Sequence, residues 1–293
     1  MKCLISLLVL ACTGIPALAQ VSSLVHKEEK RRYIVYTPEA DQSQPQQTFP
    51  VVFNFHGGGM SMAEQMLYTQ MNKTAERHRF IVVYPQGIKQ DWNVDFGMDY
   101  LAGTDDVGFT QAILSKLKQD YRIDDKRVYA TGLSRGGFFA LRLAAELPQQ
   151  FAAVASVGAP MPEPVLQHHQ KKDKVGMLLM QGTADKVVLF EGKAASYLSA
   201  EDTFDYWRKH NGIDGGVPAA RLLPTAPGDD TQVTHVEQGN GAGGARVALI
   251  TVKDGGHTWP GADAFNVGLP IGKTTRAIDA NEVMWEFFSR HRR

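Results

Sequence analysis

The stretch Arg127–Glu146 constrains the fold of this chain more than any other part. Within it, Val128–Thr131 is short, β-prone and followed by a glycine, which predicts a buried strand. Phe138–Glu146 is apolar almost all round and predicts a buried helix. Between them stands Gly132-Leu-Ser-Arg-Gly136, a G-x-S-x-G pattern in the strand–turn–helix context that gives it meaning. A sharp turn there would push Ser134 out at the top of the sheet, where its hydroxyl can act as a nucleophile.

Gly132 and Gly136 fit this interpretation because a Cβ at either position would collide with the packed strand and helix. The start of the helix also offers free N–H groups, which favour developing negative charge beside Ser134. The alternative is an ordinary strand–helix turn whose small residues only permit close packing. With 28 glycines in the chain, roughly one chain in ten of this composition would hold a G-x-S-x-G by chance, so other parts of the sequence must decide.

Length and composition favour one α/β domain. The 293 residues are 43% apolar, and strands alternate with helices over mostly short connections, which indicates a mostly parallel sheet. The 31 basic and 31 acidic side chains cancel, which argues against nucleic acid or an anionic membrane surface as partner. No zinc spacing, dinucleotide fingerprint or later membrane-spanning stretch is present, so we expect no metal, no cofactor and no membrane span.

The first 19 residues resemble an export signal, with Lys2 before an apolar run and Ala17-Leu-Ala19 as a cleavage site. We therefore expect a secreted or periplasmic protein whose mature domain is 20–293. The alternatives are a buried first element and a lipoprotein anchored through Cys12. Both cysteines, Cys3 and Cys12, lie in this segment, so cleavage before Gln20 would leave no disulfide, thiol nucleophile or cysteine metal site.

A second chemical feature is His56-Gly-Gly-Gly59, which follows the predicted strand Pro50–Phe55. Backbone N–H groups in such a loop can approach a ligand because no Cβ blocks them. Two convergent N–H groups can stabilise a tetrahedral oxyanion, and we expect the donors to be Gly58 and Arg135. We expect His56 to be structural, with its ring bonded to local backbone. A plain flexible turn is the alternative for the glycines.

The acid and the base that would serve Ser134 can be predicted from their places after strands. Asp185 stands just past the predicted strand Val175–Met180, and His257 stands on a glycine-flanked loop after the last predicted strand, Arg246–Val252. A neutral imidazole can take the serine proton and return it to a leaving group, and a carboxylate orients that imidazole. Asp202 and Asp205 are rival acids, but both fall in a predicted helix.

Several other segments leave alternatives open. Trp92, at a strand's carboxyl end, and Trp259, next to His257, either contact substrate or pack locally. The loop-rich stretch 213–245 either covers the site or is a surface excursion. Residues 20–29 are polar and predicted to be frayed. A single helix is predicted over 61–78, with Met62, Met66, Leu67 and Met71 in the core. Thr104-Asp-Asp106 is predicted to cap the following helix.

Several blocks together resemble the secreted bacterial α/β-hydrolases that are similar to polyhydroxybutyrate depolymerases and feruloyl esterases. These blocks are His56-Gly-Gly-Gly-Met60, Val83-Tyr-Pro-Gln-Gly87, Asp105-Asp-Val-Gly-Phe109, Val128-Tyr-Ala-Thr-Gly-Leu-Ser-Arg-Gly-Gly137, Gln181-Gly-Thr-Ala-Asp185 and Gly255-Gly-His-Thr-Trp-Pro-Gly261. The resemblance implies an α/β-hydrolase fold with a mostly parallel sheet and helices on both faces. It also implies that Ser134 is the nucleophile, Asp185 the acid and His257 the base.

The resemblance implies a serine carboxylic-ester hydrolase whose partner is a small or oligomeric ester. Phe138 stands where this family commonly has a smaller residue or methionine, and the family's late cysteines are missing near Ile213 and Gly241. No residues remain for a linker and polymer-binding domain, which favours feruloyl or acetyl esters or hydroxyalkanoate oligomers over solid polyester. A serine peptidase of the same fold and a non-catalytic binding protein are the alternative functions.

Overall fold

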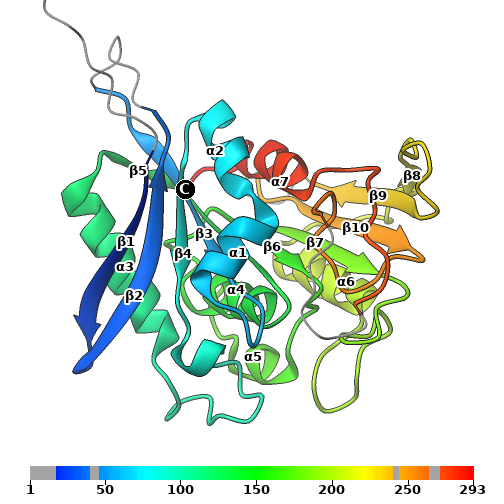
Figure 1. The fold of residues 1–293 in the computed structure, drawn as a ribbon. Helices are drawn as coiled ribbons and strands as arrows, with labels where there is room; N and C mark the ends of the chain where they lie inside the picture. The colour runs from blue at the N-terminus through cyan, green and yellow to red at the C-terminus, as the bar shows by residue number, and fades with distance from the viewer. Residues whose placement is uncertain (1–17, 40–45, 240–243, 264–270) are drawn as a thin grey trace, which may run out of the picture.

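A computed structural model describes residues 18–39, 46–239, 244–263 and 271–293. Within these residues, ten strands form one sheet in the order β1-β2-β4-β3-β5-β6-β7-β10-β9-β8 (Figure 1). The inner strands β4, β3, β5, β6, β7 and β10 run parallel, whereas β1, β2, β9 and β8 pair antiparallel at the two ends. The predicted mostly parallel sheet is confirmed.

The strands are β1 (Leu18–His26), β2 (Glu29–Thr37), β3 (Phe49–Phe55), β4 (Ile81–Pro85), β5 (Ile123–Leu133), β6 (Ala153–Val157), β7 (Gly176–Gly182), β8 (Arg221–Leu222), β9 (Gln232–Gln238) and β10 (Val247–Lys253). The helices are α1 (Met62–Thr69), α2 (Met71–His78), α3 (Asp106–Asp120), α4 (Arg135–Glu146), α5 (Glu163–His168), α6 (Ala200–His210) and α7 (Ala280–Ser289), with a short 3-10 turn at Ile88–Gln90.

Helices cover both faces of the sheet, and each face has its own core. One core contains side chains of α3, α4 and α6, and the other contains side chains of α1, α2 and α7. The inner strands are almost continuously apolar because neither of their faces meets water. Within the described residues, no helix is both long and apolar enough to cross a membrane.

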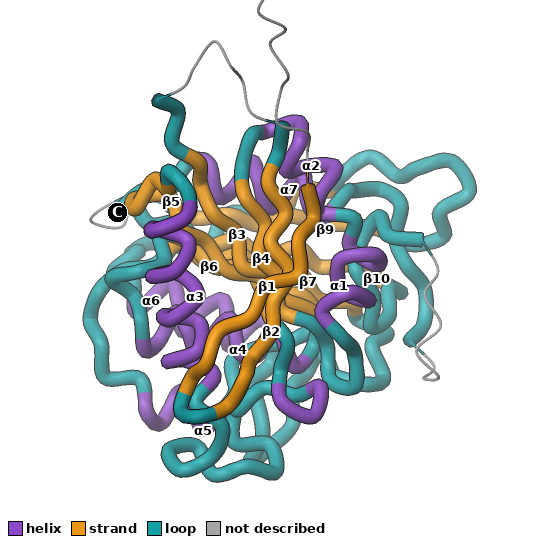
Figure 2. The backbone as a smooth tube through the Cα atoms, turned by 60° about the vertical axis from the view of Figure 1, so that its left-hand side comes forward, coloured by secondary structure: helices purple, strands orange, loops and turns teal. Residues whose placement is uncertain are grey.

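The amino-terminal part of the sheet differs from the sequence prediction. Residues 20–29 are not frayed: β1 pairs antiparallel with β2 along its whole length, from Leu18 opposite Thr37 to His26 opposite Glu29 (Figure 2). This strand was missed because it is largely exposed and its apolar residues do not alternate with polar ones, so it lacks the pattern that marks a half-buried strand. Residues 1–17 of the predicted export signal lie outside the described residues, and its last two residues belong to β1.

The predicted helix over 61–78 is in fact two helices. Gln70 adopts a left-handed conformation with φ of 49° and separates α1 from α2. Ser61 begins α1 with a capping box, in which its hydroxyl accepts from the Glu64 N–H while Glu64 accepts from the Ser61 N–H. Met62 and Met71 are buried as predicted, but Leu67 is 67% exposed, so its assignment to the core is wrong.

The long connection after α6 extends the sheet instead of remaining irregular. Residues 221–222 and 232–238 form the antiparallel pair β8–β9, and β9 continues onto β10. The described part of 213–245 therefore contributes sheet edge at the end opposite β1 (Figure 1).

Candidate active site

The G-x-S-x-G turn has the geometry of a tight strand-to-helix elbow. Ser134 lies between β5 and α4 with φ of 55° and ψ of −120°, a strained conformation for a residue with a side chain. A Cβ at Gly132 would come within 2.4 Å of the Gly136 carbonyl carbon, and a Cβ at Gly136 would come within 2.2 Å of the Phe55 oxygen. The steric reason predicted for both glycines is thus confirmed, and the elbow sits directly against the end of β3.

Asp185 and His257 are in contact although 72 residues separate them in the chain. Asp185 follows β7 and His257 follows β10, and these strands are parallel neighbours, so both residues emerge at the same edge of the sheet. The Asp185 Oδ2 lies 2.7 Å from the His257 Nδ1, and both side chains are buried. The rival acids belong to α6, where Asp202 bonds Ser199 and Asp205 pairs with Arg208.

The carboxylate of Asp185 is fixed by three further donors. Its Oδ1 accepts from the backbone N–H groups of Val187 and Val188, both at 2.8 Å, and its Oδ2 accepts from Gln181 Nε2 at 3.2 Å. Because an ionised carboxylate only accepts hydrogen bonds, the His257 Nδ1 carries a proton. In the neutral ring this leaves Nε2 as a proton acceptor. Gln181 and the two backbone donors were not identified from the sequence.

The imidazole of His257 lies over the strand next to Ser134. The Ser134 N–H donates to the Val157 oxygen at 2.8 Å, and a Cβ placed on the following residue, Gly158, would be 3.0 Å from the His257 ring. Ser134 and the His257 ring therefore lie at neighbouring points of the sheet edge. Among the described residues the Ser134 hydroxyl makes no hydrogen bond, and such contacts are often long without substrate.

The two residues expected to supply the oxyanion donors are neighbours, one on the loop after β3 and the other at the start of α4. The His56 Nδ1 donates to the Gly57 oxygen at 2.8 Å. In a trans peptide the N–H points opposite to the preceding C=O, so the Gly58 N–H points away from His56. Gly58 is exposed, and a Cβ on it would lie 3.6 Å from the Arg135 Cβ. Arg135 is the first residue of α4, where backbone N–H groups have no partner within the helix.

His56 is buried and bonded to backbone on both sides, which matches its predicted structural place. The Gly87 N–H donates to its Nε2 at 2.9 Å, while Nδ1 serves Gly57. Burial lowers the pKa of His56 to about 4, so the ring is neutral near pH 7. The neutral ring therefore links the glycine loop to Gly87, because it donates to Gly57 through Nδ1 and accepts from Gly87 through Nε2.

The low pKa of buried histidines predicts a loss of stability in mild acid. Burial also lowers the pKa of His291 to about 4, whereas an unfolded histidine takes up a proton near pH 6.5. Between pH 6.5 and 4 the unfolded chain therefore binds more protons, and the free energy of unfolding falls as the pH falls. We expect each of the two histidines to contribute a loss of about 2 kcal/mol between pH 7 and pH 5.

Urea unfolding at pH 7 and pH 5 measures this loss, and His291→Gln tests its source. The variant removes one of the two groups far from Ser134, and it should show a clearly smaller drop in unfolding free energy. Carboxylates with a lowered pKa, such as Glu282 at about 2, lose their contribution to the free energy of unfolding mainly below pH 4.5, the ordinary pKa of a glutamate. They therefore contribute little to the difference between pH 7 and pH 5. An equal drop in both proteins would contradict the assignment.

Trp92 does not line a substrate pocket, and that prediction is corrected. Its side chain is 0% exposed, stacks on Phe139 at 5.2 Å between ring centres, and donates from Nε1 to the His56 oxygen at 2.9 Å. Its place after a strand suggested a ligand contact, but the loop folds the ring inward beneath the glycine loop. Trp259 is 1% exposed and bonds Asn281 through Nε1, beside a cavity of about 260 Å³ next to α1 and α2.

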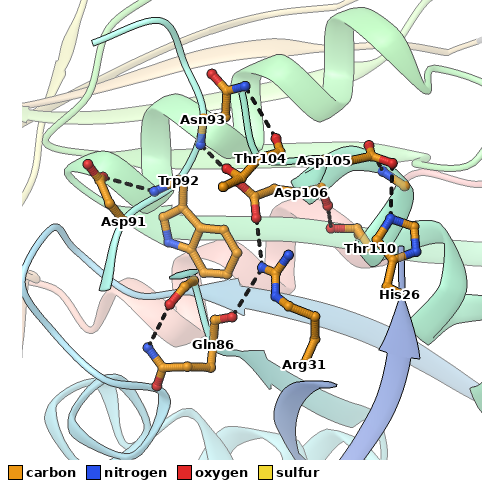
Figure 3. A network of polar contacts seen from close by, with 12 residues as sticks. His26, Arg31, Gln86, Asp91, Trp92, Asn93, Thr104, Asp105, Asp106 and Thr110 are labelled. Carbon is orange, nitrogen blue, oxygen red and sulfur yellow. Dashed lines mark hydrogen bonds and ion pairs between the residues drawn. The ribbon is translucent and has the colours of Figure 1, made fainter. Parts of the chain in front are cut away.

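The two acidic residues at the start of α3 have different tasks. Asp105 caps the helix as predicted, accepting from the Gly108 N–H at 2.9 Å. Asp106 is instead fully buried and forms an ion pair with Arg31 at 2.7 Å, while also accepting from the Asn93 N–H at 2.9 Å (Figure 3). Within the described residues no group of three or more histidine, cysteine or acidic side chains is placed to hold a metal ion.

Comparison with known proteins adds family membership to this geometry. Residues 26–205 match the model of the family Esterase, described as "Putative esterase". The chain belongs to the Esterase family. The matched range includes Ser134 and Asp185, and His257 lies beyond it. This esterase is 30% identical to "Putative esterase NocK" of Nocardia uniformis over 81% of its own chain and 73% of the relative.

Further relatives carry more specific names. The esterase is 27% identical to feruloyl esterase B of Piromyces equi over 71% of its chain, and it spans only 39% of that relative's length. The acetyl xylan esterase of Aspergillus awamori has a similar structure, with a TM-score of 0.63 over 92% of this chain and 99% of that one, at 14% identity. That likeness shows the α/β-hydrolase fold. Together, the family and the named relatives identify a carboxylic ester hydrolase.

Proposed function

We propose that this esterase works through a Ser134–His257–Asp185 triad and is exported before it acts. The observation that carries the triad is the 2.7 Å contact between His257 Nδ1 and Asp185 Oδ2, with the ring lying over Gly158 beside Ser134. A binding protein would need neither this buried acid–imidazole pair nor a strained serine on the neighbouring strand. Export is supported by the sequence of residues 1–19; a mature amino terminus at Gln20, read by mass spectrometry, would test it.

The reaction begins with attack of the Ser134 Oγ on the ester carbonyl carbon, while the His257 Nε2 takes the hydroxyl proton. The new O–C bond gives a tetrahedral intermediate, and its negative oxygen accepts from the N–H groups of Gly58 and Arg135. Asp185 stabilises the imidazolium that forms. His257 then returns the proton to the leaving alcohol. Water, deprotonated by the same imidazole, attacks the acyl-enzyme and releases the acid.

The substrate class that we propose is a soluble ester with a small or oligomeric acyl group, such as a feruloyl, acetyl or hydroxyalkanoate ester. The names of the relatives support it: feruloyl esterase B of Piromyces equi and poly(3-hydroxyalkanoate) depolymerase C of Paucimonas lemoignei, the latter 27% identical over 52% of this chain. A serine peptidase would use the same three residues, so only substrates can separate the two activities.

A substrate panel tests this function. Purified protein is assayed with p-nitrophenyl acetate, p-nitrophenyl butyrate, methyl ferulate and a peptide anilide. We expect turnover of at least one ester and none of the anilide, because alkoxide or phenolate leaves the tetrahedral intermediate more readily than an amine. Cleavage of the anilide alone would favour the peptidase, and turnover of neither class would contradict the proposal.

A further inference from the structure

The short segment Gly87–Asp91 contacts both parts of the proposed oxyanion site. At one end the Gly87 N–H bonds His56, as described above. In the middle the Gln90 oxygen accepts from the Gly59 N–H at 2.9 Å. At the other end the Asp91 Oδ1 lies 2.8 Å from the Arg135 Nε. The segment thus joins the glycine loop after β3 to the first residue of α4.

The backbone of this segment is strained, which indicates that its shape is imposed by its surroundings. Lys89 and Gln90 have φ of 51° and 59°, in the left-handed region that side chains other than glycine rarely adopt. Strain of this kind concentrates at functional sites. A Cβ at Gly87 would come within 2.2 Å of the Asp91 backbone oxygen, so the turn leaves no room for a side chain at this position.

Buried residues also fix the end of this segment and the two residues that follow it. Asp91 Oδ1 accepts from the Trp92 N–H at 2.9 Å (Figure 3). The Trp92 ring is buried and donates from Nε1 to the His56 oxygen, next to the glycine loop. The next residue, Asn93, is fixed by the buried Asp106 and by Arg142, whose Nη1 donates to the Asn93 oxygen at 2.8 Å. These contacts fix the backbone around Asp91, so its carboxylate can hold the Arg135 side chain in one position.

The guanidinium of Arg135 is engaged by residues of the connection between β4 and α3. Besides Asp91, it lies over the Phe96 ring, 5.1 Å from its centre, and donates from Nη1 to the Phe96 oxygen at 3.4 Å. What Arg135 can offer a reacting oxyanion is its backbone N–H. The position of that N–H relative to the Gly58 N–H depends on how α4 and the glycine loop are held together.

We propose that Asp91 is a positioning residue for ester hydrolysis, which sets the separation of the Gly58 and Arg135 N–H groups by tying Arg135 to the segment that carries Gln90. This role rests on the proposed function, because it acts through the oxyanion donors named there. Asp91 itself touches no substrate. Its effect should nevertheless be large, because a misplacement of about 1 Å in a catalytic group can cost roughly a hundredfold in rate.

Asp91→Ala tests the proposal, with Asp124→Ala as the matched control. Asp124 also pairs with an arginine Nε, that of Arg127 at 2.7 Å, and accepts a backbone N–H, that of Lys126 at 3.0 Å, but it lies near the start of β5, whereas Ser134 follows its end. We expect Asp91→Ala to lower kcat by about tenfold to a hundredfold with KM within about twofold. The control should keep kcat within about twofold. A loss of kcat no greater than in the control would overturn the proposal.

A double-variant cycle and hydrogen exchange separate positioning from other causes. If Asp91 acts through the Arg135 side chain, Asp91→Ala combined with Arg135→Ala should be no slower than the slower single variant, whereas independent roles would multiply the losses. Exchange of the Gly59 and Met60 amides, both hydrogen-bonded, should be faster in Asp91→Ala than in Asp124→Ala. If the wild-type protein hydrolyses no ester, the proposed function fails, and this exchange tests the structural tie by itself: faster exchange supports a tie from Asp91 to the glycine loop, and unchanged exchange overturns it.

Discussion

Ser134→Ala is expected to lower kcat for ester hydrolysis by about three orders of magnitude or more, because it removes the hydroxyl on which the proposed acyl-enzyme forms. The proposed oxyanion donors are backbone N–H groups, which this substitution does not remove, so we expect binding of the ester to change little. Initial rates on whichever ester the wild-type protein turns over fastest, corrected for contaminating esterase, measure the effect. Ser199→Ala is the control: it removes the hydroxyl that caps α6 and accepts from the Asp202 N–H, and it should leave kcat unchanged.

The same position offers a second readout that does not depend on substrate. Alanine keeps the strained backbone of Ser134, whereas glycine relieves it because it has no Cβ. We expect Ser134→Gly to unfold with a free energy at least as high as that of Ser134→Ala, with relief of strain worth on the order of 1 kcal/mol. Undiminished turnover in Ser134→Ala would remove the proposed nucleophile.

The elbow and the acid–histidine pair could be predicted because they depend on local rules. A glycine-flanked serine between a strand and a helix allows one backbone path, and residues that follow parallel strands emerge at one edge of the sheet. That is why Asp185 and His257 could be paired from their places in the sequence, and their contact at 2.7 Å agrees with it. The structural place of His56 follows from the same reasoning, since a histidine leading into a glycine loop has backbone groups on both sides.

The parts that escaped prediction depend on contacts with distant residues. From its place after a strand, Trp92 could either contact substrate or pack locally, and the sequence could not decide because the direction of its ring is set by the distant His56 carbonyl and Phe139. β1 was missed because an exposed edge strand is stabilised by pairing with β2 and not by burial. Asp91 carries no signal in the sequence at all, because its importance comes from an arginine 44 positions later.

Asp185→Asn is expected to lower kcat by about four orders of magnitude, although the variant differs from the wild type by a single isosteric group. The Val187 and Val188 N–H groups both point at Oδ1 and require an acceptor there. The asparagine oxygen must take that position, which turns its NH₂ group toward the His257 Nδ1. Nδ1 must then accept, so the ring proton moves to Nε2. An imidazole with its proton on Nε2 cannot take the proton of Ser134, and catalysis stops at the first step.

Nitrogen NMR of His257 measures this directly, because the tautomer with the proton on Nε2 should replace the one with the proton on Nδ1. Asp202→Asn is the control, since that carboxylate bonds the Ser199 hydroxyl on α6 and should leave both tautomer and kcat unchanged. Thermal unfolding should change by no more than a few degrees in either variant, because each keeps the size of its side chain. Full activity in Asp185→Asn, or loss of activity in Asp202→Asn instead, would show that Asp185 is not the catalytic acid. In that case β7 and β10 would not be the strands that bring the acid and the histidine together.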